Sequence, residues 1–343
     1  MRALFIGLGG IGQRHLRILK KLHPDVEIAA VRKIGRSFEI GDDLNLDRSV
    51  DIVDKYNIRT YSSVSGALSF APDFAVLANP TSMHLAAARK LVENKIPILM
   101  EKPVSNTDEG LDELLELSDR NSTLIMVGYM MRFHPCAVQL KKYLENNVLG
   151  DIYSVVVTVN SYMPQWHKYE GYNEFYAGKQ DLGGGVVLTE IHEIDLLYWF
   201  FGTPQKIGAV GGTLSKLDLD VEDTVSILME QKIEKRRFPV NVNMSFVQKA
   251  PIRNFLVLGE RGSLEWDIAN NKLRLDDYED ALHSENNFPK FERNDMFQEQ
   301  MKYFLDCVRT GKPSFTSLEN VVGGHRVALV IKDALKAESF IKL

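Results

Sequence analysis

Apolar and polar positions in the first part of the chain repeat in two alternating ways. Short apolar runs, typical of buried strands, are followed by loops or by segments of helical period. They predict strands at residues 3–6, 26–31, 60–61, 74–78, 97–100 and 124–127, and helices at 13–22, 85–94 and 111–119. A polar stretch at 41–54 predicts a loop with a short helix. This alternation predicts an α/β fold with a parallel, doubly wound sheet, a Rossmann domain over residues 1–127.

The pattern changes after residue 127, where strands follow one another with few helices between them. A helix is predicted at 136–146, and strands at 152–162, 205–214, 222–231, 238–246, 253–259 and 262–267. Several of these strands alternate polar and apolar residues, which is typical of an antiparallel sheet with one open face. Two helices at 295–309 and 318–336 close the chain. We therefore predict a second α/β domain over residues 128–343, whose closing helices could pack back on the first.

The turn between the first predicted strand and helix is rich in glycine. Gly7, Gly9 and Gly12 have the spacing G-x-G-x-x-G. In a βα unit these glycines permit a tight turn, a close approach of a pyrophosphate and close packing of the helix on the strand. The phosphates would lie against the free N–H groups at the helix start. We expect this loop, with Gly10 and Ile11, to bind a dinucleotide; a purely structural glycine turn is the alternative.

Basic residues follow the second predicted strand, where the NAD version of this fold commonly places an acid for the ribose hydroxyls. Arg32 and Lys33 stand there, with Arg36 shortly after. Because arginine offers a planar set of donors to phosphate oxygens, these residues suit a 2′-phosphate. The sequence therefore favours NADP(H) slightly over NAD(H), with a solvated basic loop as the alternative.

Composition narrows the class of protein. The chain of 343 residues is 45% hydrophobic and 25% charged, with a net charge of −5. Such a balance predicts neither a basic surface for nucleic acid nor a polybasic membrane patch. No apolar run approaches the roughly 20 residues that cross a bilayer. The two cysteines, Cys136 and Cys307, are far apart in sequence and form no metal-spaced pair, so we expect a reduced, cytoplasmic protein.

Polar residues follow the fourth and fifth predicted strands, at the edge where parallel sheets bind ligands. Asn79, Pro80, Thr81 and His84 follow the strand at 74–78, although Pro80 could simply start a helix and His84 could simply cap one. Glu101 and Lys102 follow the strand at 97–100. Partial burial beside a cationic nicotinamide ring would favour the neutral amine of Lys102, which suits hydrogen bonding to a reacting hydroxyl.

A glycine-rich start leads into an almost wholly apolar helix predicted within residues 183–202. His192 and Asp195 lie three residues apart in it and therefore share a face. A carboxylate beside a buried imidazole would fix its tautomer and tune its pKa, as a general acid–base requires. The alternative is a core histidine whose hydrogen bonds are satisfied by its neighbours and which has no catalytic role. A zinc site would need more ligands than this spacing offers.

An aromatic segment precedes that helix. Residues 162–181 include Trp166 and Tyr176, whose rings and polar tips suit stacking on sugars or nucleotides. A loop that packs on its own domain, or in a subunit contact, is the competing interpretation.

Together these residues resemble the Gfo/Idh/MocA family of sugar and polyol oxidoreductases over essentially the whole chain. The motifs are GLGGIG at 7–12, NPTSMH at 79–84, EKP at 101–103, GYMMRFHP at 128–135 and GGGVVLTEIHEID at 183–195. The resemblance implies a Rossmann domain and a second domain whose open sheet often mediates homodimers or homotetramers. It also implies Lys102 and His192 at the hydride-transfer site, with Asp195 nearby. Many members carry Asp at the position of Thr189, which puts one substrate contact in doubt.

The resulting hypothesis is an NAD(P)-dependent oxidoreductase acting on a secondary hydroxyl or ketone of a sugar or nucleotide-sugar. The segment 166–185 is similar to a branch linked to amino-sugar, nonulosonate and surface-glycan metabolism. His192 would exchange the hydroxyl proton while Lys102 orients that oxygen, or the reverse. The expected substrate contacts are Lys102, Tyr129, Arg132, Trp166, Tyr176, Thr189 and His192. The rival hypotheses are a non-catalytic dinucleotide or sugar sensor, and an imine reductase, lyase or hydrolase of the same fold.

Overall fold

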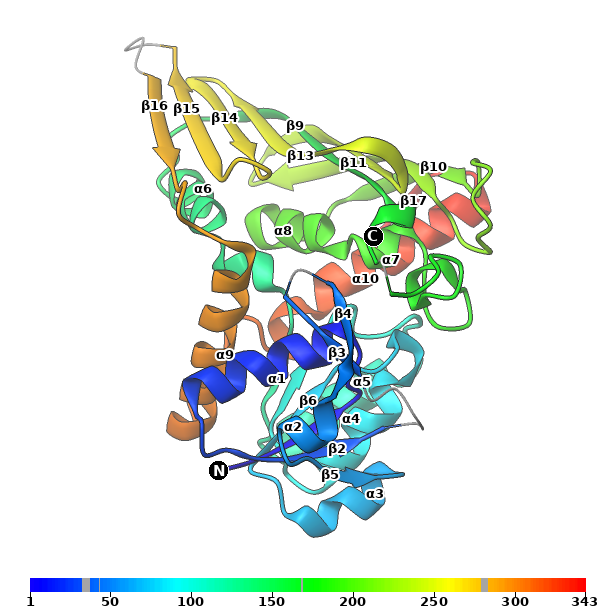
Figure 1. Ribbon diagram of the computed structural model, residues 1–343. Coiled ribbons are helices and arrows are strands. Elements are labelled where there is room, and N and C mark those ends of the chain that lie inside the picture. Colours follow the sequence, from blue (N-terminus) through cyan, green and yellow to red (C-terminus); the bar gives the residue numbers. More distant parts are fainter. Residues whose placement is uncertain (33–37, 43, 168, 279–282) are drawn as a thin grey trace.

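The computed structural model describes residues 1–32, 38–42, 44–167, 169–278 and 283–343. Two β-sheets lie one above the other, with helices between and around them (Figure 1). Within the described residues, the lower sheet has six parallel strands in the order β5-β2-β1-β6-β7-β8. Their bounds are Arg2–Ile6 (β1), Glu27–Val31 (β2), Arg59–Tyr61 (β5), Phe74–Leu77 (β6), Ile98–Met100 (β7) and Ile125–Val127 (β8). Each overlaps a predicted run, so the predicted Rossmann sheet is confirmed.

Three helices of this part of the chain follow the prediction, namely α1 (Gly10–Leu22), α4 (His84–Glu93) and α5 (Leu111–Arg120). Two short helices join them: α2 (Ile52–Lys55), and α3 (Val64–Ala67), which was not predicted. Helix α1 packs so closely on the turn after β1 that a side chain at Gly12 would collide with the carbonyl oxygen of Gly7. Short 3₁₀ helices lie at Leu68–Phe70, Thr81–Met83, Met130–Phe133, Met163–Gln165 and Tyr176–Gly178.

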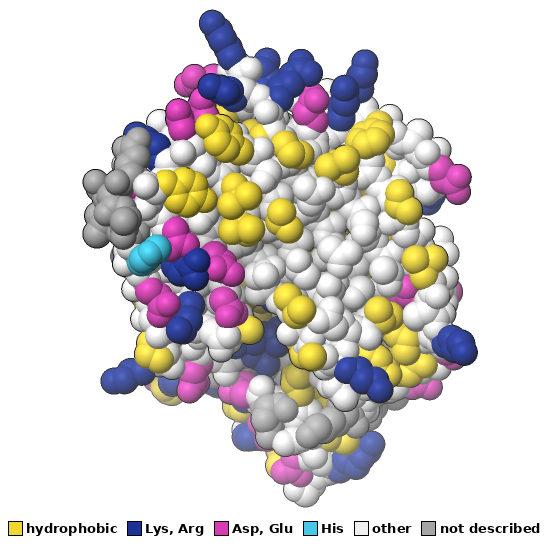
Figure 2. All heavy atoms as spheres, turned by 90° about the horizontal axis from the view of Figure 1, so that it is seen from above, with side chains coloured by type: hydrophobic (Ala, Val, Ile, Leu, Met, Phe, Trp, Pro, Cys, Tyr) yellow, Lys and Arg dark blue, Asp and Glu magenta, His cyan; other side chains and the backbone are white. Residues whose placement is uncertain are grey.

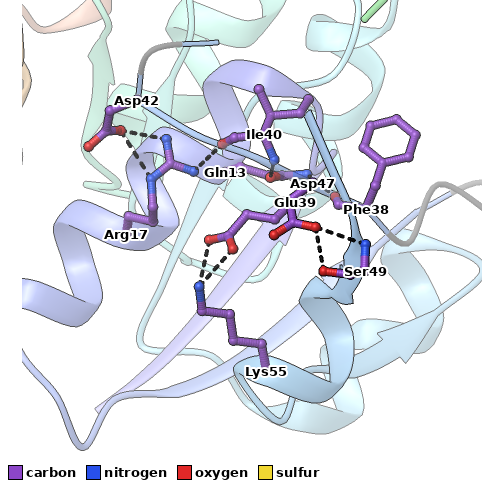
Figure 3. A network of polar contacts seen from close by, with 9 residues as sticks. All are labelled: Gln13, Arg17, Phe38, Glu39, Ile40, Asp42, Asp47, Ser49 and Lys55. Carbon is purple, nitrogen blue, oxygen red and sulfur yellow. Dashed lines mark hydrogen bonds and ion pairs between the residues drawn. The ribbon is translucent and has the colours of Figure 1, made fainter. Parts of the chain in front are cut away.

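The loop and short helix predicted at 41–54 are partly wrong, because a hairpin occupies much of this region. It consists of β3 (Phe38–Ile40) and β4 (Leu46–Asp51), and only α2 matches the predicted short helix. These strands carry charged residues at many positions, so they show no apolar run. Side chains of α1 hold the hairpin instead (Figure 3). Gln13 accepts from the Ile40 amide at 2.7 Å, and Arg17 donates to the Ile40 carbonyl at 2.6 Å.

The upper sheet is mostly antiparallel, as predicted. Within the described residues it has nine strands in the order β16-β15-β14-β13-β9-β12-β11-β10-β17, and only β12 and β9 pair in parallel. The bounds are Ile152–Tyr162 (β9), Lys206–Gly212 (β10), Thr224–Ile233 (β11), Arg236–Ser245 (β12), Val247–Gly259 (β13), Gly262–Asp267 (β14), Lys272–Asp277 (β15), His283–Asn287 (β16) and Ile341–Lys342 (β17). The last three were not predicted, because they are short or strongly polar.

Helices cover the lower face of this sheet (Figure 1). They are α6 (Pro135–Glu145), α7 (Val186–Thr189), α8 (Ile191–Phe201) and α10 (Leu318–Ala337), whereas α9 (Arg293–Thr310) lies lower, beside α1. The helix predicted within 183–202 is interrupted at Glu190, whose ψ of 32° ends α7 before α8 begins. None of the helices in the described ranges is long and apolar enough to cross a membrane.

The end of the chain returns to the lower sheet. Helix α9 packs on α1, and its Phe304 ring contacts Phe74 of β6 at 5.5 Å between centroids. The amide of Val127 donates to the carbonyl of Thr316 at 2.8 Å, so the segment before α10 pairs with β8. The closing helices thus pack against the first part of the chain, which the sequence analysis allowed for.

Candidate active site

A cleft of about 1190 Å³ lies where the lower sheet meets the elements beneath the upper sheet. Its wall brings together most of the residues that the sequence singled out. These are Gly7, Gly9, Gly10, Ile11, Arg32, Asn79, Pro80, Thr81, Glu101, Lys102, Trp166, Tyr176, Thr189 and His192. Gly12, His84, Tyr129, Arg132 and Asp195 do not line it, and Lys33 lies outside the described residues.

The glycine loop fits a phosphate group. Gly7 has φ of +94°, and a side chain there would lie 2.7 Å from the Ala78 carbonyl, so the tight turn requires glycine. A Cβ on Gly9 would meet no atom within 4 Å, which leaves open space in front of α1. Gly9 is the N-cap of α1 and provides no side-chain hydrogen bond. The first N–H groups of α1 are therefore available to an anion.

At the end of β2, Arg32 lines the cleft beside Ser62 and Ser63, which follow β5. The predicted basic residue Lys33 lies outside the described residues. Hydroxyl groups and a guanidinium at this edge can donate to ribose or phosphate oxygens.

The residues after β6 and β7 are tied together behind the cleft wall. The ring nitrogens of His84 lie 2.9 Å from the carbonyl oxygens of Asn79 and Pro103, so this buried histidine joins the two strand ends. Burial lowers the pKa of His84. Glu101 is held in place by another histidine, since its Oε1 lies 2.6 Å from Nε2 of His15 on α1. His84 therefore holds the cleft wall in place without lining it.

Lys102 and His192 approach each other from the two halves of the structure. The Lys102 Nζ donates to the Thr189 carbonyl at 2.6 Å, directly before the break that starts α8 and places His192 in its first turn. Burial lowers the pKa of Lys102. Burial, followed by the charges of Lys102, Arg253 and Arg293, holds the pKa of His192 well below its usual range. Both groups are thus biased toward their neutral forms at one end of the cleft.

Asp195 does not support His192, so this part of the prediction is wrong. Its carboxylate accepts two hydrogen bonds from Arg132, at 2.8 and 2.7 Å, and both side chains are at most 2% exposed. Arg132 also donates to the Phe315 carbonyl at 3.0 Å. A buried carboxylate needs a compensating cation, and Arg132 supplies it although His192 shares its helix face. His192 Nδ1 has no hydrogen-bond partner among the described residues.

Two residues predicted to contact the substrate, Tyr129 and Arg132, lie away from the cleft. Arg132 is engaged by Asp195, and Tyr129 is fully buried behind His192, against which its ring packs edge-on at 6.1 Å. Tyr129 and Arg132 therefore shape the packing of α8 and line no part of the cleft.

The aromatic segment before α7 closes the cleft from above. Trp166 packs edge-on against Phe246, which lies between β12 and β13, and lines the cleft together with Tyr176. Tyr169 extends to the glycine loop, since a side chain at Gly10 would lie 2.6 Å from its hydroxyl oxygen. The segment thus reaches the glycine loop and also lines the cleft.

Three arginines in the cleft wall escaped the sequence analysis. Arg14 comes from α1, Arg253 from β13 and Arg293 from the start of α9. Arg253 donates to Glu193 at 2.5 Å and lies 3.8 Å from Glu190. No local motif could have revealed them, because three distant elements bring them together. Among the described residues, no group of three or more His, Cys, Asp or Glu could hold a metal ion.

Comparison with known proteins agrees with this architecture. Residues 1–129 match the model described as an oxidoreductase family with an NAD-binding Rossmann fold. Residues 137–265 match the GFO/IDH/MocA C-terminal domain. The chain is 27% identical over 198 residues to the rhizopine catabolism protein MocA of Rhizobium meliloti, covering 57% of this chain and 56% of that protein. It is 22% identical to the UDP-N-acetylglucosamine 3-dehydrogenase of Acidithiobacillus ferrooxidans, covering 100% of this chain and 99% of that protein.

Solved structures share the fold over the whole chain. The WlbA dehydrogenase of Bordetella pertussis, in complex with NADH and UDP-GlcNAcA, is 19% identical with a TM-score of 0.80, covering 100% of this chain and 98% of that one. A myo-inositol dehydrogenase of Corynebacterium glutamicum is 20% identical with a TM-score of 0.74, with the same coverage. With both domain models matched in order, the chain belongs to the Gfo/Idh/MocA family of NAD-binding oxidoreductases.

Proposed function

We propose that this protein is an NAD(P)-dependent dehydrogenase or reductase that interconverts a secondary hydroxyl and a ketone of a sugar. The observation that carries the proposal is the meeting of Lys102 and His192 in the cleft that begins at the glycine loop. A sensor of dinucleotides or sugars needs no pair of proton-transfer groups beside its cofactor site.

The two residues divide the proton chemistry. A dinucleotide held at the glycine loop, Gly7 to Gly12, would supply the hydride chemistry at the substrate carbon, in either direction. His192 is held neutral by its lowered pKa and takes up the hydroxyl proton as the carbonyl forms, then returns it on reduction. Lys102 donates a hydrogen bond to the same oxygen and stabilises the negative charge that develops there. The reverse assignment, with Lys102 as proton carrier, uses the same geometry.

Replacing Lys102 tests this role. Lys102→Met removes the hydrogen-bond donor while keeping a long side chain, so turnover should fall by roughly 10²- to 10⁴-fold. NADH and NADPH should bind as tightly as to the unchanged protein, as measured by fluorescence titration. Lys90→Met is the matched control, because Lys90 lines the cleft from α4. Unchanged turnover of UDP-sugars and polyols in the Lys102 variant would exclude the assignment.

The proposed substrate is a sugar, with nucleotide-sugars included. Trp166 and Tyr176 offer rings and polar tips to such a ligand. Thr189 stands where many relatives have Asp, and its hydroxyl is buried in the cleft wall without a partner among the described residues. We assign this hydroxyl to a substrate hydrogen bond in place of the carboxylate. The similarity to a UDP-N-acetylglucosamine 3-dehydrogenase supports this class of substrate.

For the cofactor we keep the preference for NADP(H) over NAD(H). It is supported by Arg32, which lines the cleft at the end of β2, where an acid would favour NAD.

The open face of the upper sheet is the proposed surface for a homodimer or homotetramer. Leu228, Asn241, Val156 and Leu256 are neighbours across four strands. Val156 is 38% and Leu228 41% exposed, although both are large and apolar. Figure 2 shows apolar side chains spread across this face, with charged groups gathered toward its margins. Apolar surface of this kind is typical of a contact with a second copy.

A further inference from the structure

Arg293 occupies an unusual position in the cleft wall. It is the first residue of α9, and its side chain is solvent-accessible although it lies inside the cleft. The surrounding protein, together with the charges of Arg14 and Arg253, lowers the pKa of its guanidinium to about 10. A solvent-accessible cation in the wall of a cleft can face a ligand that the cleft holds.

The guanidinium of Arg293 makes no hydrogen bond or ion pair with any residue that the structure describes. Two carboxylates, those of Glu190 and Glu101, act on the Arg293 guanidinium through their charge. Each of them already has another partner. Glu101 is 2.6 Å from His15, and Glu190 is 3.8 Å from Arg253. The positive charge of Arg293 is therefore not neutralised by a contact within the described parts of the chain.

A second cation lies beside it. The Arg14 Nη1 donates to the side-chain oxygen of Asn294, the residue next to Arg293, at 2.5 Å. Arg14 Nη2 also donates to the backbone carbonyl of Asp42 at 3.3 Å, so both hydrogen-bond acceptors are uncharged, while the carboxylates of Asp42 and Glu101 act on Arg14 through their charge. Two guanidinium groups held near each other by the fold repel, and an anion between them would relieve that repulsion.

The position of this pair relates it to the substrate. Arg293, Lys102 and His192 all line the same cleft, and the charge of Arg293 adds to the effect of burial, which lowers the pKa of the other two. It also lowers the pKa of His167, in the aromatic segment above the cleft. The N–H groups that await the phosphates of a dinucleotide lie instead at Gly10 and Ile11, at the start of α1.

We propose that Arg293, assisted by Arg14, forms an anion subsite that binds a carboxylate or phosphate group of the substrate. The inference rests on the proposed function and narrows its substrate class to negatively charged sugars, including sugar nucleotides. Guanidinium groups favour such groups because their paired donors match two oxygens of one anion.

The test uses UDP as the phosphate probe, D-glucuronate as the carboxylate probe and D-glucose as the neutral control. Binding is measured by calorimetry on the whole protein, both free and saturated with NADH. Arg293→Gln should weaken binding of UDP or D-glucuronate by about 10- to 100-fold, the worth of one charge-assisted contact. NADH affinity should stay within about twofold of its original value. Arg309→Gln, at the far end of α9 and outside the cleft, is the matched control.

The outcomes separate the inference from the proposed function. If Arg293→Gln weakens NADH binding and leaves both probes unaffected, Arg293 serves the cofactor and the inference is wrong. Absence of binding of both probes to the unchanged protein overturns it as well. If NADH does not bind but UDP or D-glucuronate binds in an Arg293-dependent way, the anion subsite stands and the proposed oxidoreductase function falls.

Discussion

The buried pair of Arg132 and Asp195 allows a quantitative test of its structural role. Arg132→Met would remove both hydrogen bonds to the carboxylate and the bond to the Phe315 carbonyl. Breaking a buried ion pair from one side costs about 3–5 kcal/mol, and one further lost hydrogen bond about 1 kcal/mol. We expect the free energy of unfolding to fall by about 4–6 kcal/mol at pH 7, a large share of the 5–15 kcal/mol typical of proteins.

Urea unfolding followed by tryptophan fluorescence measures this loss. The double variant Arg132→Met with Asp195→Leu should be more stable than the single variant, since it leaves no uncompensated carboxylate. Arg237→Met is the control, because Arg237 forms an exposed pair with Glu230 at 3.1 Å and should change stability little.

The pH dependence of the stability of the Arg132→Met variant gives a second test of the structural role. Without Arg132, burial alone acts on Asp195 and raises its pKa above the value of the unfolded chain. The folded variant then binds more protons than the unfolded chain, so its stability deficit should shrink as the pH falls from 7 toward 4. A variant with unchanged stability and strongly reduced turnover would refute the structural role and restore Arg132 as a substrate contact.

Two further predictions concern the cofactor and acid stability. Arg32→Asp should weaken NADPH binding at least tenfold and leave NADH binding unchanged or tighter, as measured by fluorescence titration. An unchanged preference between the two cofactors would show that Arg32 does not contact the 2′-phosphate. Burial lowers the pKa of His325 to about 4, so this residue is neutral in the folded protein where the unfolded chain takes up a proton. The free energy of unfolding should therefore fall as the pH drops from about 6.5 to 4. His325→Leu should reduce the slope of this free energy against pH by up to about 1.4 kcal/mol per pH unit. An unchanged slope would contradict the burial argument.

The sequence predicted those parts of the molecule whose physical cause is local. Apolar runs such as Phe74–Leu77 are buried on both sides and stand out from their neighbours. The glycine loop could be predicted because its backbone leaves no room for a side chain at positions 7 and 12, so only glycine fits there. By contrast, β16 consists of the polar residues His283–Asn287 and forms a strand only because β15 offers it a hydrogen-bonding edge.

The candidate site was predicted only in part for a related reason. Lys102 and His192 lie within recognisable motifs, and both line the cleft. The shared helix face of His192 and Asp195 was inferred correctly, but helix spacing cannot reveal that Arg132, 63 residues away, takes the carboxylate. Arg293 belongs to no motif, and its significance depends on the absence of a partner within the described structure, which only the folded arrangement makes visible.

The pairing of residues 316–317 with β8 means that the sheet of the first 127 residues is completed at one edge by the far end of the chain. Cut off after β8, they would leave an unprotected sheet edge open to strand addition from other chains. They would also lose Phe304, which covers Phe74 from α9, and thereby expose apolar surface. We therefore expect the Rossmann sheet to complete its packing only after the C-terminal helices have been synthesised.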